Sequence, residues 1–174
     1  MTQFSDSIPV FCTARIPKVV LDEFFATACG APDFVSEGIH GDVAVLINDI
    51  KTHSIAQPTN PPVTQPSSYP FEGQTPQEIW QYAQACLRYP VLNRAIAILD
   101  DQTLLDKETC LLVTRSEHEQ EDGSRLLTVR SDFESALVIL NVKNLGIGGD
   151  EHFTSGRGKD GVIRLYECEK KREG

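Results

Sequence analysis

Five consecutive apolar residues, Ala95 to Leu99, end abruptly in two carboxylates, Asp100 and Asp101, and no other stretch constrains the fold as strongly. A continuous apolar run of this length is typical of a strand that is buried on both faces of a sheet. A second apolar run, Cys110 to Val113, follows after a polar crossing, so we interpret the two runs as strands of one sheet. Open α/β sheets often bind ligands just beyond the carboxyl ends of their strands, where Asp100 and Asp101 would lie.

The first fifty residues predict a strand, a helix and a second strand. The short run Ile8 to Cys12 contains β-branched and aromatic residues, which favour a strand. Pro17 suits the first turn of a helix, and the apolar residues between Val20 and Ala28 recur at the spacing of one helical face. The run Val43 to Ile47 then predicts a second buried strand, which ends before Asn48 and Asp49.

The remainder of the chain predicts a helix, a hairpin, a short helix and a last strand. A T-x-x-E capping box at Thr75, with proline next to it, marks a helix start, and Pro90 closes that helix. The run 125–130 is expected to pair antiparallel with the Cys110 strand across an acidic turn. Asp132 should cap a short helix through 136–140, and 162–166 should form a strand. We therefore expect one α/β domain over residues 1–174, with a mixed sheet of about five strands and two or three packing helices.

Two stretches are predicted to be irregular. Residues 56–74 form a long Pro-rich loop, because proline removes backbone donors, and Tyr69 and Phe71 could anchor its far end. A lid, a mobile insertion and a proline-rich docking peptide all remain open for this loop. The Gly-rich tract 146–161 matches neither the phosphate loop nor a strand-borne G-x-G-x-x-G, so we predict no nucleotide cofactor there.

Composition and charge exclude several classes of partner. The formal net charge is −9, which argues against a nucleic-acid partner, because a protein that binds phosphate backbones usually carries a basic face. The one basic cluster, 170–172, is interpreted as a solvated tail. No apolar run approaches the roughly 20 residues of a membrane span, and the chain starts without a signal-peptide pattern. We expect neither a membrane partner nor a membrane location.

Five cysteines lie far apart, without C-x-x-C spacing. An odd count in a chain without a secretion signal indicates reduced thiols and a cytoplasmic location. Most of these cysteines have apolar neighbours, so we interpret them as small buried packing residues. Cys110 is the best alternative candidate for a nucleophile, although no base lies near it in the sequence.

An acid/base enzyme is one hypothesis for the function, with no metal and no cofactor. Its candidate catalytic residues are the strand-end carboxylates Asp49, Asp100 and Asp101, together with Arg130 at the end of another strand and His152 in a glycine-flanked loop. Two neighbouring carboxylates do not both ionise easily, so one would have a raised pKa. Arg130 could hold an anionic group of a small organic substrate in an isomerase, lyase or cyclase type of reaction.

A binding or interaction domain for a small molecule or a protein partner is the competing hypothesis, and we favour it slightly. The acidic surface, the Pro-rich loop and the lack of a recognised catalytic motif support it. Whether the protein is an enzyme therefore stays open. A metal site formed by His40, Asp42, Asp49 and His53 is the least favoured alternative, because such spacings arise often by chance.

The order of several short segments resembles a family of small proteins known only as a domain of unknown function. The matching features span most of the chain: an apolar start before a helix, followed in order by LDDQTLL, CLLV, RLLTVR, NVKNLGIGGDEHF and DGVIR. The resemblance supports the expected fold. It implies no active-site residues, because that family carries no activity that could be transferred.

Overall fold

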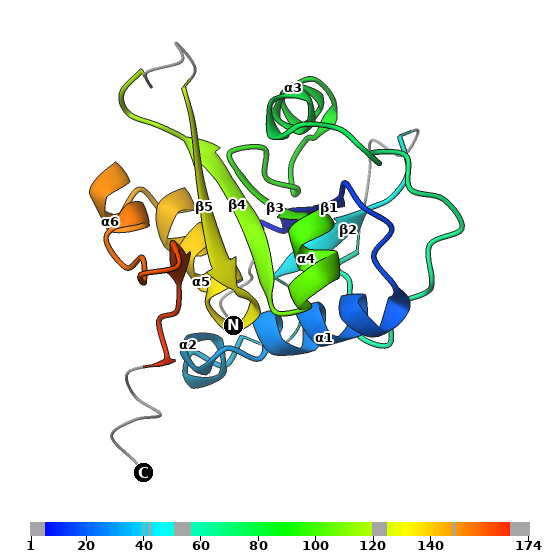
Figure 1. Ribbon diagram of the computed structural model, residues 1–174, viewed down its shortest axis with the longest axis horizontal. Coiled ribbons are helices and arrows are strands. Elements are labelled where there is room, and N and C mark those ends of the chain that lie inside the picture. Colours follow the sequence, from blue (N-terminus) through cyan, green and yellow to red (C-terminus); the bar gives the residue numbers. More distant parts are fainter. Residues whose placement is uncertain are drawn as a thin grey trace.

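One mixed six-stranded sheet organises the part of the protein that the structure describes (Figure 1). The structure is a computed structural model, which describes residues 6–39, 41, 43–50, 57–119, 125–147 and 149–167, without the side chain of residue 152. The strand order is β2-β1-β3-β4-β5-β6. The strands are β1 (Ile8–Cys12), β2 (Ala44–Ile47), β3 (Ala95–Leu99), β4 (Thr109–Arg115), β5 (Leu126–Asp132) and β6 (Val162–Ile163). The α/β fold with a mixed sheet is thus confirmed, with one strand more than expected.

The first three strands are parallel, and β1 lies between the other two. Val10 of β1 pairs with Leu46 of β2 on one side and with Ala97 of β3 on the other. The sheet then changes direction, because β4 pairs antiparallel with both β3 and β5. The predicted hairpin is therefore confirmed. Because β1 separates β2 from β3, the carboxyl ends of β2 and β3 lie about 10 Å apart along the sheet.

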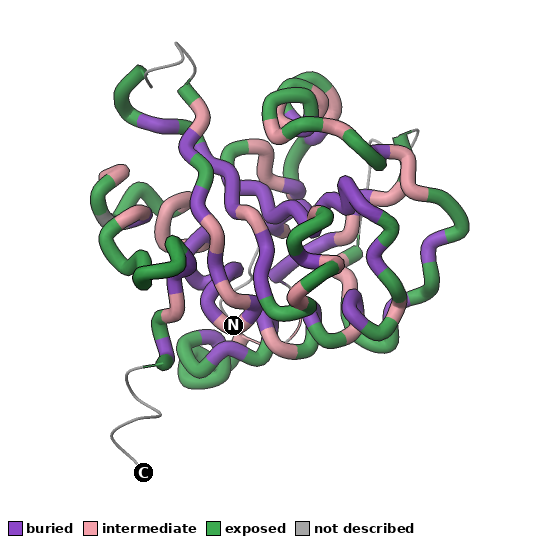
Figure 2. The backbone as a smooth tube through the Cα atoms, viewed as in Figure 1, coloured by how far each residue is buried: buried purple, intermediate pink, exposed green. Residues whose placement is uncertain are grey.

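Helices cover both faces of the sheet. Two hydrophobic clusters result, one on each side: α1 and α5 pack on one face and α3 on the other, as the purple strands between them in Figure 2 illustrate. The helical segments within the described residues are α1 (Lys18–Cys29), α2 (Pro32–Ser36), α3 (Pro76–Cys86), α4 (Asp101–Asp106), α5 (Phe133–Asn144) and α6 (Asp150–Thr154). No helix among them combines the length and the apolar character that crossing a membrane requires.

The helix starts follow the predicted caps. The Thr75 side chain accepts a hydrogen bond from the Glu78 amide, and Glu78 reaches back to the Thr75 amide, so the capping box is confirmed. Asp132 caps α5 through the Ser135 amide at 3.0 Å. α5 runs beyond the predicted 136–140, because nearly all of its first eight residues are buried between the sheet and α1.

Short helices occupy two stretches in which the sequence predicted no helix. α4 fills the polar crossing between β3 and β4, and α6 lies within the glycine-rich tract. Each is less than two turns long, too short to show a full apolar repeat in the sequence. Both nevertheless fix the position of a carboxylate, as described below.

The Pro-rich loop contains no helix or strand in its described residues 57–74, as predicted. Internal contacts fasten it to the domain. The Val63 amide donates to Asp22 of α1 at 2.6 Å, and the Tyr69 hydroxyl donates to the Ile16 carbonyl at 2.5 Å. Phe71 is 1% exposed and packs edge-on against Phe11 of β1. Tyr69 and Phe71 are therefore the anchors that the sequence predicted.

Candidate functional site

Asp100 and Arg130 are the two predicted site residues that the structure brings into direct contact. The Arg130 guanidinium donates to Asp100 Oδ2, and both side chains are about four-fifths buried, with 20% and 22% exposed. The contact forms because β4 pairs with both β3 and β5, so that the end of β3 and the end of β5 lie on either side of Thr109. Thr109 Oγ1 accepts a second hydrogen bond from Arg130 at 3.2 Å.

The Asp100 carboxylate is engaged on both oxygens. Oδ1 accepts hydrogen bonds from the amide and the hydroxyl of Thr103, at 3.0 and 3.1 Å, and thereby caps α4. Oδ2 accepts the hydrogen bond from Arg130. Both carboxylate oxygens are therefore occupied by partners within the protein. This geometry suits a structural joint, meaning a link between β5 and the start of α4, better than a general acid or base.

A second carboxylate, that of Asp106, holds Thr109 in place beside the Asp100 and Arg130 pair. Asp106 accepts hydrogen bonds from the Thr109 hydroxyl at 2.6 Å and from the amides of Glu108 and Thr109, both at 2.9 Å. Burial acts to raise the pKa of Asp106, but these hydrogen bonds outweigh it and hold the pKa below its ordinary value. Asp106 was missed in the sequence because it ends a helix that had not been predicted.

The other predicted site residues lie apart from this pair. Asp49 is exposed at the end of β2 and is separated from Asp100 by β1. Asp101 is exposed in the first turn of α4. His152 belongs to α6, which contacts β5, and its side chain lies outside the described residues. The strand-end carboxylates thus share one edge of the sheet, but Asp49 does not join the Asp100 and Arg130 pair.

The Pro-rich loop contacts the chain next to the position where an open sheet of this order would bind a ligand. Such sheets bind ligands beyond the carboxyl ends of the two strands at which the winding reverses, here β1 and β3. The Gly73 amide of the Pro-rich loop donates to the Thr13 carbonyl at 2.9 Å, directly after β1. Glu72 pairs with Arg15 at 2.9 Å. The loop is therefore attached to the segment that directly follows β1, and its role as a lid, an insertion or a docking peptide stays a prediction.

The described cysteines are packing residues. Cys12, Cys29 and Cys110 are buried, Cys86 is half-buried, and all four are free thiols. Burial raises the pKa of Cys12 to about 12 and that of Cys29 to about 11. It also raises the pKa of Cys110 far above its ordinary value, although nearby Arg130 acts in the opposite direction. These thiols are protonated at neutral pH, the opposite of what a nucleophile requires.

Metal-ligating side chains do not cluster within the described residues: no group of three or more His, Cys, Asp or Glu side chains there is suited to hold an ion. Of the four residues considered for a metal site, only Asp49 is described. His40, Asp42 and His53 lie outside the described residues.

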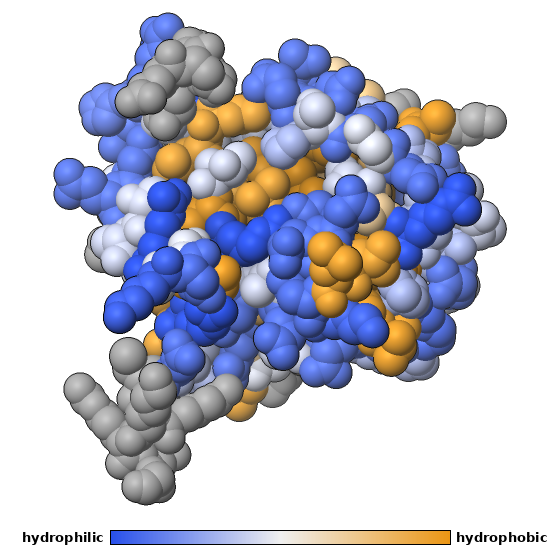
Figure 3. Space-filling model, viewed as in Figure 1, coloured by the Kyte–Doolittle hydropathy of each residue, from blue (hydrophilic) through white to orange (hydrophobic). Residues whose placement is uncertain are grey.

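A polar groove lies at the opposite end of the strands from Asp100. It is bounded by α3, the start of β3, the end of β4 and the start of β5. Its volume is about 790 Å³. Trp80 and Gln84 of α3 form one wall, and Gln84 donates a hydrogen bond to the Asn93 carbonyl, which holds the start of β3 against the helix. Figure 3 shows the apolar surface between α3 and the hairpin, bordered by hydrophilic residues.

Three exposed arginines line this groove: Arg94, Arg115 and Arg125. The last pair of the β3–β4 ladder is Ala95 with Thr114, so Arg94 directly precedes this pair and Arg115 directly follows it. Both arginines line the groove on the α3 side of the sheet. None of the three arginines forms an ion pair with another described residue.

The sequence does contain a signal for this groove, in three arginines that flank predicted strands. Arg94 precedes the β3 run, Arg115 follows the β4 run, and Arg125 precedes the β5 run. Antiparallel pairing of successive strands places the start of one beside the end of the next. The predicted hairpin alone would therefore have placed Arg115 and Arg125 together.

Comparison with known proteins gives no match: no family model, no curated protein and no solved structure is significantly similar to the chain. The function is therefore inferred from the described residues alone.

Proposed function

We propose that the protein is a binding domain for a small anionic organic molecule, which it holds in the groove between α3 and the β3 to β5 strand ends. The observation behind the proposal is that Arg94, Arg115 and Arg125 line the same groove, with Arg94 and Arg115 next to the last pair of the β3–β4 ladder. Like charges gathered in one groove repel each other. An anion bound between them would turn this repulsion into charge-assisted hydrogen bonds.

The rest of the groove supports an apolar or planar body for the ligand. Half-buried Trp80 and Leu126 lie in the same groove as the arginines. Binding sites for small molecules usually combine apolar and aromatic walls with a few polar groups, in volumes of about 300 to 1,000 Å³. The groove volume of about 790 Å³ lies within that range. A ring that bears a phosphate or carboxylate group fits this combination.

The net charge of the chain supports a small anion rather than a long polyanion. At −9, the protein repels a nucleic acid beyond the groove itself, whereas a compact anion lies within reach of the three arginines. The proposal includes a reducing, cytoplasmic environment, because the four described cysteines are free and three of them are buried.

An acid/base enzyme at the strand-end carboxylates has less support. Asp100 is committed to a helix cap and an ion pair, and the Pro-rich loop is hydrogen-bonded to the segment that follows the neighbouring strand β1. Neither observation provides a free general base next to an open site. Binding in the arginine groove, by contrast, requires no rearrangement of the fold.

Trp80 makes the test direct, because it is the only tryptophan in the chain. Phenyl phosphate would be titrated while Trp80 fluorescence is recorded, with benzamide as a neutral probe. We expect a saturable change with phenyl phosphate that is at least about tenfold weaker in Arg94→Gln and in Arg115→Gln, since a hydrogen bond to a charged group contributes about 1.5 to 3 kcal/mol. Arg15→Gln is the matched control, because Arg15 is exposed and lies at the opposite end of the strands from the groove. Equal affinity in all three variants, or equal binding of benzamide, contradicts the proposal.

A further inference from the structure

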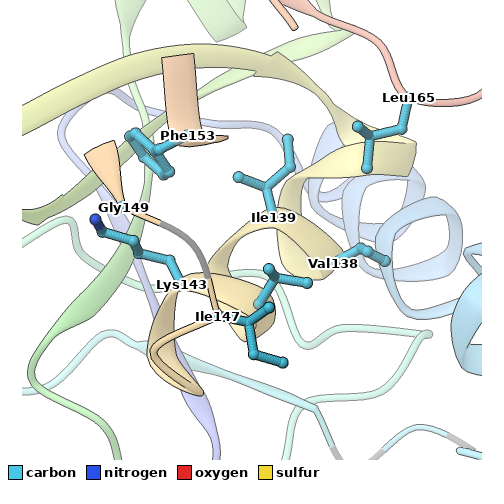
Figure 4. Close-up of a pocket in the computed structure, with 8 residues that line it drawn as sticks. Val138, Ile139, Lys143, Ile147, Gly149, Phe153 and Leu165 are labelled. Atoms are coloured by element: carbon cyan, nitrogen blue, oxygen red, sulfur yellow. The ribbon is translucent and has the colours of Figure 1, made fainter. Parts of the chain in front are cut away.

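An apolar cavity lies on the other side of the sheet, between α5 and α6. Figure 4 shows its lining, with Val138 and Ile139 from α5, Phe153 from α6, Ile147 from the segment after α5 and Leu165 from the segment after β6. The volume is about 170 Å³. The cavity belongs to neither the Asp100 and Arg130 joint nor the arginine groove, because α6 packs on the face of the sheet that faces away from α3.

The mouth of the cavity is apolar as well. Ile147 is 58% exposed and Leu165 is 42% exposed, although both are large apolar side chains. Phe153, at the base, is only 3% exposed. A molecule that enters the cavity would therefore contact apolar side chains along its whole depth. Each square ångström of apolar surface that it covers contributes about 25 cal/mol.

The charges beside the cavity neutralise each other. Lys143 runs along one wall, and its ammonium donates to Asp150 at 2.8 Å. Asp150 also accepts hydrogen bonds from the Ser116 hydroxyl at 2.5 Å and from the Glu117 amide at 3.0 Å. The side chains of the ion pair are only 12% and 18% exposed. Because Lys143 is paired, the described residues that line the cavity offer no free cation to an anionic ligand and no free anion to a cationic one.

From this combination we infer that the cavity between α5 and α6 binds a small neutral apolar molecule of about the size of one aromatic ring. The size limit follows from the volume: an apolar protein cavity of about 150 Å³ stays free of water and binds benzene. A fatty acid or a large planar cofactor exceeds about 170 Å³, and a charged ring would lose its hydration without gaining a partner. This site is independent of the anion groove.

NMR signals of the methyl groups that line the cavity can show whether a molecule binds there. Val138, Ile139, Val142, Ile147 and Leu165 all carry methyl groups and line the cavity, so methyl NMR spectra report its occupancy. Benzene is the probe, and benzoate and benzylamine are its charged counterparts. We expect saturable shifts confined to the lining methyl groups with benzene, and an affinity at least about tenfold lower for either charged ring, because burial of an unpaired charge is costly.

Substitutions separate binding in the cavity from binding elsewhere. Val142→Phe places a ring in the cavity and should abolish the benzene shifts, whereas Val19→Phe, at a 70% exposed position of α1, should leave them unchanged. Ile147→Ser, at the exposed mouth, should weaken benzene binding without affecting the folded core. It replaces Val142→Phe as the test of the site if Val142→Phe does not fold. Arg115→Gln should leave benzene affinity unchanged, even if it removes anion binding.

The inference is overturned by any of three results. The first is an absence of benzene shifts in the unsubstituted protein. The second is an equal response to benzene and benzoate. The third is a change of the lining methyl signals with protein concentration alone, since that would show that Ile147 and Leu165 meet a second copy of the chain.

Discussion

Arg130 and Asp100, thirty residues apart in the chain, are joined by an ion pair that ties the end of β5 to the start of α4. Asp100→Ala removes both the helix cap and the partner of a mostly buried arginine. We expect it to lower the free energy of unfolding by about 2 to 4 kcal/mol. Urea denaturation followed by circular dichroism measures this change.

Asp101→Ala is the matched control, because the neighbouring carboxylate is exposed and lies in the same turn. It should change the free energy of unfolding by no more than about 0.5 kcal/mol. Equal effects of the two substitutions would show that the Asp100 joint is not a source of stability. A large loss of stability in Asp100→Ala would also mean that a loss of any activity in that variant says nothing about catalysis.

The second prediction concerns the Pro-rich loop, which the hydrogen bonds of Val63 and Gly73 fasten to the domain. In hydrogen-exchange experiments these two amides should exchange far more slowly than the amides of exposed Ser67 and Ser68. Phe71→Ala should cost about 3 to 5 kcal/mol, because the ring is fully buried. Fast exchange at Val63 and Gly73 would favour a mobile insertion instead.

The third prediction is a loss of stability in acid that depends on Asp106. Its pKa is lower in the folded protein than in the unfolded chain, so its contribution is present above about pH 4 and is lost as the pH falls through the folded-state pKa. Asp106→Asn should lower the free energy of unfolding at pH 7 by about 1 kcal/mol. It should also make the decline below pH 4 shallower. Identical slopes in both proteins would contradict this role for Asp106.

The fourth prediction concerns thiol reactivity. Cys12, Cys29 and Cys110 should resist iodoacetamide at pH 8 in the native protein and react after unfolding, whereas half-buried Cys86 should react first among the described cysteines. Peptide mass spectrometry assigns each label. Because burial raises the pKa of the buried thiols, their contribution to stability is present at neutral pH and is lost as the pH rises above the ordinary value of 9.0. Rapid labelling of native Cys110 would restore it as a candidate nucleophile.

The fifth prediction links the arginine groove to stability. Arg115→Gln removes one of the three positive charges that line the groove, so the variant should be more stable than the unsubstituted protein by about 0.2 to 1 kcal/mol at low salt. The difference should shrink as salt is added, because the arginines are exposed. Thermal unfolding at two salt concentrations tests this. A destabilised Arg115→Gln would show that Arg115 has a structural partner, and the groove would lose its main support.

Most of the fold could be predicted because local signals agreed with it. The bounds of β1 and β3 match the apolar runs Ile8 to Cys12 and Ala95 to Leu99, since both strands are buried on both faces. The T-x-x-E box at Thr75 located α3 because a cap is a local interaction. The short helix α4 was missed for the opposite reason: Asp100 looked like a strand end, and the capping partner Thr103 is buried in a stretch without an apolar repeat.

The candidate site was harder to predict, because it depends on the order of strands. Asp49 and Asp100 both follow buried runs, and no local feature shows that β1 lies between them. The contact between Asp100 and Arg130 likewise requires β4 to pair on both sides. Residues at strand ends could be named from the sequence, but their neighbours are set by pairings between distant segments.

The position of β1 in the interior of the sheet also has a consequence for synthesis on the ribosome. β1 is made first, but its second neighbour is complete only at Leu99, long after β2 has ended at Ile47. At typical translation speeds this interval lasts about 3 to 10 seconds. During that time one edge of an apolar strand stays unpaired, which is a template for aggregation. The nascent chain is therefore expected to be a substrate for ribosome-associated chaperones until residue 99 has emerged.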